Sequence, residues 1–127
     1  MLKALIIGLG GGVGAILRYV IGGYVQQWTN STTFPYGTLA VNVLGCLFIG
    51  LLSELAETRG FFNPELRLFL FIGLLGGFTT YSTFGSESIN LLRGGANQLA
   101  FGYVTLHLVA GLGAVWLGRI LVDWFWK

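Results

Sequence analysis

Four long hydrophobic stretches dominate the chain, and short polar stretches separate them. They cover about residues 2–25, 36–56, 66–92 and 99–125. A helix needs roughly 20 consecutive apolar residues to cross the hydrocarbon core of a bilayer, and each stretch is about that long or longer. The pattern therefore predicts an all-α membrane protein with four transmembrane helices, folded as a single domain over residues 1–127.

The polar stretches between them carry the signals of helix ends. Residues 26–35 read QQWTNSTTFP, and residues 57–65 read ETRGFFNPE, in which Gly60 and Pro64 are helix breakers. The last two tryptophans stand close to the C-terminus, where aromatic side chains commonly anchor a helix at the membrane interface.

Composition supports the membrane assignment and limits the classes of function. Hydrophobic residues make up 54% of the chain and charged residues only 9%, whereas a soluble domain has about 25% charged residues. The formal net charge of +2 is too small to favour nucleic-acid binding, and the single Cys46 allows no intrachain disulfide. We expect a multi-pass protein of the cell membrane (inner or plasma membrane).

The first hydrophobic stretch is predicted to be a transmembrane helix rather than a cleaved signal peptide. Signal peptides have an apolar region of about 7–15 residues followed by a small-residue cleavage site. Here the apolar run is longer, ends in YVQQ and contains no A-x-A site.

Rows of small residues mark where helices are expected to pack closely. The rows are Gly8/Gly12 and Gly10/Gly14 in the first stretch and Ala110/Ala114/Gly118 in the fourth. Small residues at this spacing let helix backbones approach each other within a membrane. Packing inside one chain would account for them, but rows in two helices of a four-helix unit favour oligomerisation.

The positive charges give a modest orientation signal. With four spans, both termini and residues 57–65 lie on one side of the membrane. The positive residues of that side are Lys3, Arg59, Arg67 and Lys127, joined by Arg119 if it reaches that far. The positive-inside rule would place this side in the cytoplasm.

The third stretch is interrupted near its middle by residues 76–84, GGFTTYSTF. Two glycines followed by hydroxyl and β-branched residues form helix poorly, so we expect a broken third helix. Irregular backbone at membrane depth occurs where protein surrounds it or where it lines a watery cavity, and facing half-helix ends often build an ion site. A glycine kink with hydroxyls bonded to their own helix is the alternative. The run of hydroxyls and the nearby Glu87 favour the ion site.

Polar residues occur inside the other three stretches as well. Thr38 and Asn42 share a face of the second, Tyr103 and His107 form an i, i+4 pair in the fourth, and Arg18 lies in the first. Ordinary roles exist for each: a helix–helix hydrogen bond for Asn42, snorkelling to the headgroups for Arg18, a core position for His107. Their occurrence in several helices favours a functional polar pathway.

Three motifs connect these features: GGGVGAILRY at residues 10–19, YGTLAVNVLG at 36–45 and GGFTTYSTFGSE at 76–87. With these motifs, its length and its four-span layout, the chain resembles the Fluc fluoride channels, the CrcB family of small microbial membrane proteins. The resemblance covers essentially the whole chain, and the third motif is the most specific.

The resemblance implies a fluoride-selective channel that exports fluoride down its electrochemical gradient and so reduces fluoride toxicity in the cytoplasm. In that family two identical subunits pack antiparallel in the bilayer, one inserted each way (dual topology). The homodimer has two fluoride pores and one central sodium ion. A structural sodium ion is therefore implied here, held by main-chain oxygens of Gly76 and Thr79 from both subunits.

The resemblance also implies a set of pore residues. These are Asn42, Thr38, Tyr81 and Phe84, with Ser82, Thr83, Tyr103 and His107 as further candidates. Arg18 and Glu87 are expected to contribute to function beside this set. Amide and hydroxyl groups donate hydrogen bonds that can replace the water of fluoride, and an aromatic ring presents a positive edge. None of these groups adds a full charge, which suits an ion that must also leave.

Two features depart from the family pattern. Tyr81 stands where the family usually has Phe, and its hydroxyl can bind the ion directly and slow or redirect its passage. Opposed insertion goes with little charge bias, whereas the terminal side of this chain has a modest positive excess.

Three other classes of protein remain as alternatives. A small proton-coupled exporter of cationic drugs needs an acidic residue in the first span, where this chain has Arg18 instead. A membrane scaffold would use the glycine rows but leaves the hydroxyl-rich break without a purpose. An enzyme fits least, because His107 has no readable nucleophile, metal-ligand or acid partner.

Overall fold

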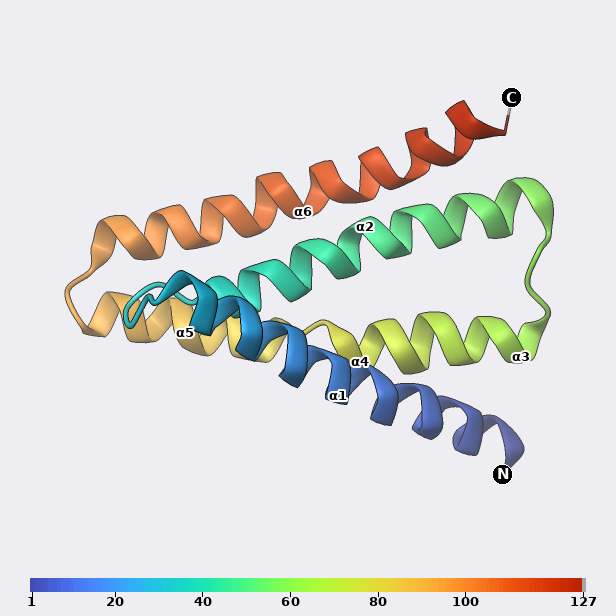
Figure 1. Cartoon of the computed structure of the whole chain (residues 1–127), viewed down its shortest axis with the longest axis horizontal. Helices are drawn as coiled ribbons and strands as arrows, with labels where there is room; N and C mark the ends of the chain where they lie inside the picture. Colours follow the sequence, from blue (N-terminus) through green and yellow to red (C-terminus); the bar gives the residue numbers. More distant parts are fainter. Residues whose placement is uncertain (127) are drawn as a thin grey trace.

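Four rods of helix make up the chain in the computed structural model, which describes residues 1–126 (Figure 1). Three rods are single helices: α1 (Leu2–Thr29), α2 (Tyr36–Arg59) and α6 (Asn97–Phe125). The third rod is segmented into α3 (Pro64–Arg67), the π-helical η1 (Leu68–Leu75), α4 (Gly76–Phe78) and α5 (Tyr81–Arg93).

All four rods are long and apolar enough to cross a membrane, and residues 1–126 contain no strand. The predicted all-α fold with four transmembrane helices is therefore confirmed. Each helical rod contains the corresponding predicted stretch and extends a few residues beyond it at one end or both. Lys127, one of the terminal charges noted above, lies outside the described residues.

Residues suited to helix ends stop and start the rods. α1 is followed by Asn30 with a left-handed backbone (φ 51°), and α2 by Gly60 (φ 61°); asparagine and glycine are the residues that adopt this conformation most readily. α3 begins with Pro64, and the Asn63 side chain accepts a hydrogen bond from the Leu66 amide at 2.8 Å. Asparagine before the helix and proline in its first turn favour a helix start.

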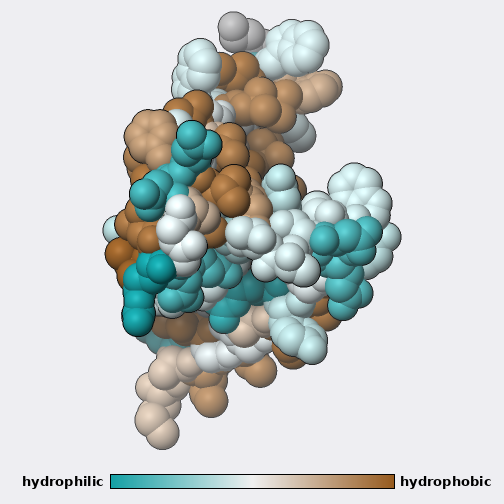
Figure 2. All heavy atoms as spheres, turned by 90° about the vertical axis from the view of Figure 1, so that its left-hand side faces the viewer, coloured by the Kyte–Doolittle hydropathy of each residue, from teal (hydrophilic) through white to brown (hydrophobic). Residues whose placement is uncertain are grey.

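The two ends of the bundle carry different parts of the chain. Both termini and the turn between α2 and α3 lie at one end, and the loops of residues 30–35 and 94–96 lie at the other (Figure 1). Figure 2 looks onto the second end, where hydrophilic groups gather between hydrophobic side chains. This arrangement agrees with the expectation that both termini share one side.

Gln26 near the end of α1 holds the loop that follows it. Its Nε2 donates to the carbonyl oxygens of Ser31 (2.6 Å) and Phe34 (3.1 Å), and its Oε1 accepts from the amide of Gly37 (3.0 Å). One side chain thus satisfies backbone groups of the loop and of the first turn of α2, which would otherwise need water.

Helix α1 packs directly on the first half of the third rod. Gly14 is buried, and a Cβ there would fall inside the contact distance of the Leu74 carbonyl oxygen. The predicted row of Gly10 and Gly14 is therefore an internal packing surface. The row of Gly8 and Gly12 faces open space within the single chain.

The third rod is broken near its middle, as predicted, but the glycine pair is not the break. Gly76–Phe78 is helical, whereas Thr79 (φ −88°, ψ 160°) and Thr80 (φ −150°, ψ 111°) are extended, and α5 resumes at Tyr81. The break therefore falls inside the predicted segment, residues 76–84, at its two adjacent threonines rather than at its two glycines.

Close packing explains a glycine at this position instead. A Cβ on Gly77 would fall inside the contact distance of the Gly11 carbonyl oxygen of α1. Glycine here permits helix contact rather than an irregular backbone. The π-helical turns of η1 lie immediately before the pair; such turns are rare and are frequent at functional sites.

Helices α2 and α6 run along each other and form the second packed pair (Figure 1). Gly118 is buried, and a Cβ there would lie 2.5 Å from the Leu47 carbonyl oxygen and 2.7 Å from the Leu51 amide nitrogen. Ala110 and Ala114, the other members of the predicted row, are half-buried. The Gly118 position of α6 is therefore used for packing on α2 within the chain.

Gly118→Ala is expected to lower the thermal unfolding temperature of the purified protein. The added methyl group would push α6 off α2, and such overpacking costs about 1–3 kcal/mol. Gly113→Ala is the matched control, because Gly113 lies in the same helix with no neighbouring atom within 4 Å of the added Cβ. Equal melting of the two variants by circular dichroism would contradict the packing assignment.

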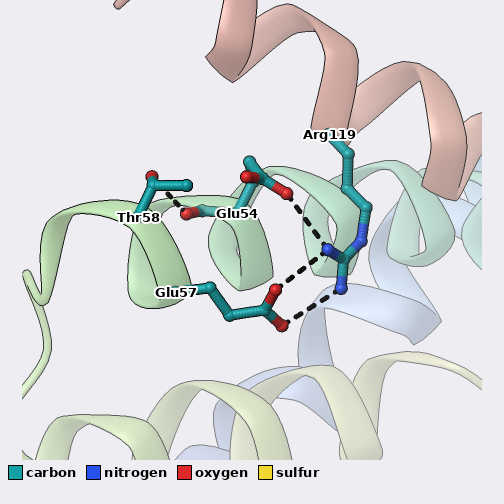
Figure 3. Close-up of polar contacts among 4 residues, drawn as sticks. All are labelled: Glu54, Glu57, Thr58 and Arg119. Atoms are coloured by element: carbon teal, nitrogen blue, oxygen red, sulfur yellow. Dashed lines mark hydrogen bonds and ion pairs between the residues drawn. The ribbon is translucent and has the colours of Figure 1, made fainter.

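An ion-pair cluster joins α2 and α6 near the end that carries the termini (Figure 3). Arg119 Nη1 lies 3.0 Å from Glu54 Oε2 and 3.1 Å from Glu57 Oε2. The Glu57 side chain is exposed, so its pair adds little stability; the Glu54 side chain is only 13% exposed, and the guanidinium gives it a partner. The cluster therefore adds a polar contact to the packed pair of α2 and α6.

Candidate functional site

Asn42 on α2 holds the break in the third rod. Its Oδ1 accepts from the Thr80 amide at 2.8 Å, and its Nδ2 donates to the Thr80 carbonyl oxygen at 3.1 Å. In a continuous helix the Thr80 amide would instead bond to the carbonyl of Gly76. The side chain of Asn42 therefore replaces helical hydrogen bonds and stabilises the extended peptide at the break.

Thr80 also starts the second half of the rod. Its Oγ1 accepts from the Thr83 amide at 3.2 Å and donates to Thr83 Oγ1 at 2.8 Å, with Ser82 Oγ 3.4 Å away. This is an N-terminal cap, which satisfies an amide that the helix leaves free. The start of α5 therefore gathers three hydroxyls at the positive end of a helix, which favours anions.

Glu87 accepts hydrogen bonds on both carboxylate oxygens. Thr38 Oγ1 of α2 donates to Oε1 at 3.0 Å, and Tyr103 OH of α6 donates to Oε2 at 2.6 Å. Tyr103 is fully buried. One carboxylate on α5 thus connects three rods, and the sequence prediction singled out its residues without foreseeing that they contact one another.

Tyr103→Phe is expected to lower the thermal unfolding temperature, because Glu87 would lose its closest donor. A hydrogen bond to a charged group contributes about 1.5–3 kcal/mol. Tyr24→Phe provides the matched control, since the Tyr24 side chain is 71% exposed. If the two variants melt together in the same detergent, the Tyr103–Glu87 bond adds no stability.

An aromatic cluster lies beside the break. The Phe84 ring centroid is 4.4 Å from that of His107, 5.7 Å from Tyr103 and 5.6 Å from Tyr81. Phe84 is half-buried, whereas Tyr81 is 85% exposed. Phe84 therefore belongs to the interior of the four-helix unit, and Tyr81 projects from it.

His107 connects this cluster to Asn42. Its Nε2 lies 3.2 Å from Asn42 Nδ2, and its Nδ1 lies 3.0 Å from the carbonyl oxygen of Tyr103 in its own helix. The i, i+4 spacing predicted from the sequence is thus used for a ring-to-backbone hydrogen bond.

The side chain of Arg18 contacts the break. Its Nη1 donates to the carbonyl oxygen of Thr79 at 3.3 Å. In a continuous helix that oxygen would accept from the Thr83 amide, which here bonds to Thr80 Oγ1. At the break, the amides that would bond to the Gly76 and Thr79 carbonyls in a continuous helix have other partners. The Thr79 carbonyl accepts from the Arg18 guanidinium instead.

Two grooves meet at Thr80. A polar groove of about 460 Å³ is lined by residues that include Arg18, Thr38, Thr83 and Glu87. A mainly apolar groove of about 380 Å³ is lined by residues that include Asn42, Tyr81, Phe84 and His107. Thr80 lines both, so the break separates the two grooves.

The structure brings most of the predicted site residues together around the break. Asn42, Thr38, Thr83, Phe84, Tyr103, His107, Arg18 and Glu87 are connected through the contacts above. Ser82 and Tyr81 are exposed at the start of α5. Gly76 is exposed and lines the apolar groove with Thr79.

Thr80 is the central residue that the sequence analysis did not single out. Thr is a preferred residue directly before a helix start, and this signal could have marked Thr80 within the motif. Among residues 1–126, no group of three or more His, Cys, Asp or Glu side chains could hold a metal ion.

Comparison with known proteins identifies the family. Residues 5–119 match the family described as CrcB-like protein, Camphor Resistance (CrcB). The chain is similar to the fluoride-specific ion channel FluC of Chloroflexus aurantiacus, with 50% identity over 98% of each chain. It is also similar to FluC of Methylobacillus flagellatus, with 43% identity over 96% of this chain and 95% of that protein. FluC 3 of Methanosarcina barkeri is 43% identical over 94% of this chain and 89% of its own.

These proteins are named as ion channels, which confirms the sequence prediction that the protein is not an enzyme. The four membrane-spanning rods and the ion-channel relatives make this a multi-pass membrane protein. Matches over nearly the whole chain also confirm the resemblance drawn from its motifs. The chain belongs to the CrcB-like family.

Proposed function

We propose that two copies of this chain form a fluoride-selective channel, through which fluoride leaves the cytoplasm down its electrochemical gradient. The observation that carries the proposal is the position of Thr80, where the polar groove and the apolar groove meet inside a membrane-spanning unit. Full-length relatives named fluoride-specific ion channels support fluoride as the ion.

The groups along the two grooves suit a small, strongly hydrated anion. On the polar side, Arg18 adds a positive charge, and the hydroxyl of Thr83 lies at the N-terminal end of α5. On the other side, the amide of Asn42 and the ring of Phe84 follow beyond Thr80. These hydrogen-bond donors would replace the water molecules around fluoride one at a time. The positive edge of the Phe84 ring would attract the anion without adding a fixed charge.

Glu87 is compatible with anion passage because its carboxylate is occupied. Hydrogen bonds from Thr38 and Tyr103 disperse its negative charge over two donors. Arg18 lines the same polar groove, and its positive charge further offsets the charge felt by an ion. We propose that Glu87 orients the hydroxyls of the pore wall and does not contact fluoride.

A second copy would complete the apolar groove. Tyr81 is 85% exposed and Gly76 is exposed, although both lie at membrane depth beside the break. An antiparallel copy would cover this face and bring the two breaks together across a two-fold axis. We propose a dual-topology homodimer with two pores, in which Tyr81 contacts the partner.

The break also offers ligands for the structural sodium ion of this proposal. The Gly76 and Thr79 carbonyls no longer accept from their usual helical donors, and oxygen atoms are the ligands that hard cations prefer. The Thr79 carbonyl oxygen has two lone pairs, and the hydrogen bond from Arg18 uses only one of them. Bound between two subunits, sodium would supply positive charge near the pores and hold the copies together.

Ion efflux from liposomes tests the proposed function directly. Purified protein is reconstituted with fluoride and chloride inside, and two ion-selective electrodes follow the release of each ion. Fast fluoride release with negligible chloride release is the expected result. If liposomes that contain verified dimers release neither ion, the protein is not a channel.

A further inference from the structure

The orientation of the Asn42 amide is determined by the backbone at the break. The Thr80 amide can only donate, so the atom 2.8 Å from it is the Asn42 oxygen. The Thr80 carbonyl can only accept, so the atom 3.1 Å from it is the Asn42 nitrogen. One of the two N–H groups of that nitrogen is thereby engaged.

The tautomer of His107 follows in the same way from its own helix. The carbonyl oxygen of Tyr103 lies 3.0 Å from Nδ1 and can only accept, so Nδ1 carries the hydrogen. In the neutral ring Nε2 then has a lone pair, and it lies 3.2 Å from Asn42 Nδ2. It accepts the second N–H of Asn42, and the two independent assignments agree at this bond.

We propose that His107 is a positioning residue, which holds the Asn42 amide so that one N–H secures Thr80 and the other stays directed to the apolar groove, where passing fluoride can share it. This inference rests on the proposed function. Phe84 packs against the imidazole ring with its centroid 4.4 Å away and keeps the ring in place. Asn42 and His107 both line the apolar groove, so fluoride that passes beside Nε2 finds the donor already aimed and no rotation of the amide is required.

The hydrogen bond between His107 and Asn42 affects the Thr80 peptide at the break. Without an acceptor at residue 107, the second N–H of Asn42 has no hydrogen-bond partner among residues 1–126, and two hydrogen bonds in place of three hold the amide. A less constrained amide holds the Thr80 peptide less firmly. The Thr80 peptide separates the two grooves, so its displacement would disturb the path itself.

Substitution of His107 separates the hydrogen-bond role from packing. His107→Gln retains an acceptor oxygen within reach of Asn42, and His107→Leu fills the space without one. We expect the Leu variant to release fluoride about five- to tenfold more slowly than the Gln variant, the effect of one lost hydrogen bond. Equal fluoride efflux from the two variants, whether fast or slow, would overturn the proposal.

A spectroscopic measurement tests the same contact without transport. His107 is the only histidine, so ¹⁵N-histidine labelling gives signals from this ring alone. In bilayers we expect a protonated Nδ1 and an unprotonated Nε2 that shifts when Asn42 is replaced by Leu. A protonated Nε2, or an Nε2 signal unchanged in Asn42→Leu, would overturn the positioning role. A wild-type protein with the expected spectrum but no fluoride efflux would instead reject the proposed function alone.

Discussion

Fluoride efflux from liposomes is expected to fall by roughly 100-fold when Asn42 is replaced by Asp. The aspartate can still accept from the Thr80 amide, but it cannot donate to the Thr80 carbonyl or to His107. Two lost hydrogen bonds in a low-dielectric site cost about 2–3 kcal/mol, which corresponds to this factor. The new negative charge lies at the junction of the grooves and also repels the permeating anion.

The control for the Asp substitution is Asn90→Asp, which makes the same chemical change at an exposed residue near the end of α5. It is expected to leave efflux close to that of the wild type. Both variants are first checked for dimer formation by size-exclusion chromatography. Efflux from the Asn42→Asp protein that equals the control would remove Asn42 from the pathway.

The four-rod fold could be predicted from sequence because lipid imposes a simple rule on it. Spanning segments must be helical and apolar, and polar residues must mark their ends. Gly60, Pro64 and Asn30 therefore fall at or next to helix ends. No comparable rule marks the π-helical turns of η1, which pack against α1 and have no sequence signal of their own.

The break was predicted in the correct rod and the correct segment, residues 76–84, but not at a particular residue. Helix propensity disfavours the glycines of this segment, because glycine weakens a helix by about 1 kcal/mol, and also the hydroxyl and β-branched residues that follow them. The structure retains helix at Gly76 and Gly77 and breaks it at Thr79 and Thr80, where Asn42 takes over the backbone hydrogen bonds. A partner far away in the sequence determines the position, and local propensity contains no information about it.

The sequence predicted the residues of the site, but it did not predict which of them contact one another. Depth within a hydrophobic stretch was enough to select Glu87, Tyr103 and His107 as candidates. That Tyr103 donates to Glu87 while His107 faces Asn42 depends on the rotation of α6 against α2 and α5. Buried Gly118 lets α6 lie close to α2, and the Arg119 ion pairs join the same two helices.

Phe84→Ile is expected to reduce fluoride efflux by roughly tenfold without disrupting the proposed dimer. Isoleucine keeps the apolar character of the site but removes the positively polarised ring edge that the proposed pore offers to the anion. It also removes the ring packed 4.4 Å from His107. Aromatic contacts of this kind contribute about 0.5–1.5 kcal/mol beyond their buried area, and the upper part of that range corresponds to about tenfold in rate.

Phe101→Ile is the matched control, because Phe101 lies on α6 with 76% of its side chain exposed and outside both grooves. Size-exclusion chromatography shows whether each variant is still a dimer, and the fluoride electrode reports efflux from equal amounts of protein. Slow efflux from intact Phe84→Ile dimers beside normal efflux from Phe101→Ile would assign the loss to the ring. Wild-type efflux from Phe84→Ile would show instead that an apolar side chain of any shape serves at this position, and the donors around Thr80 would then have to account for anion passage without a ring edge.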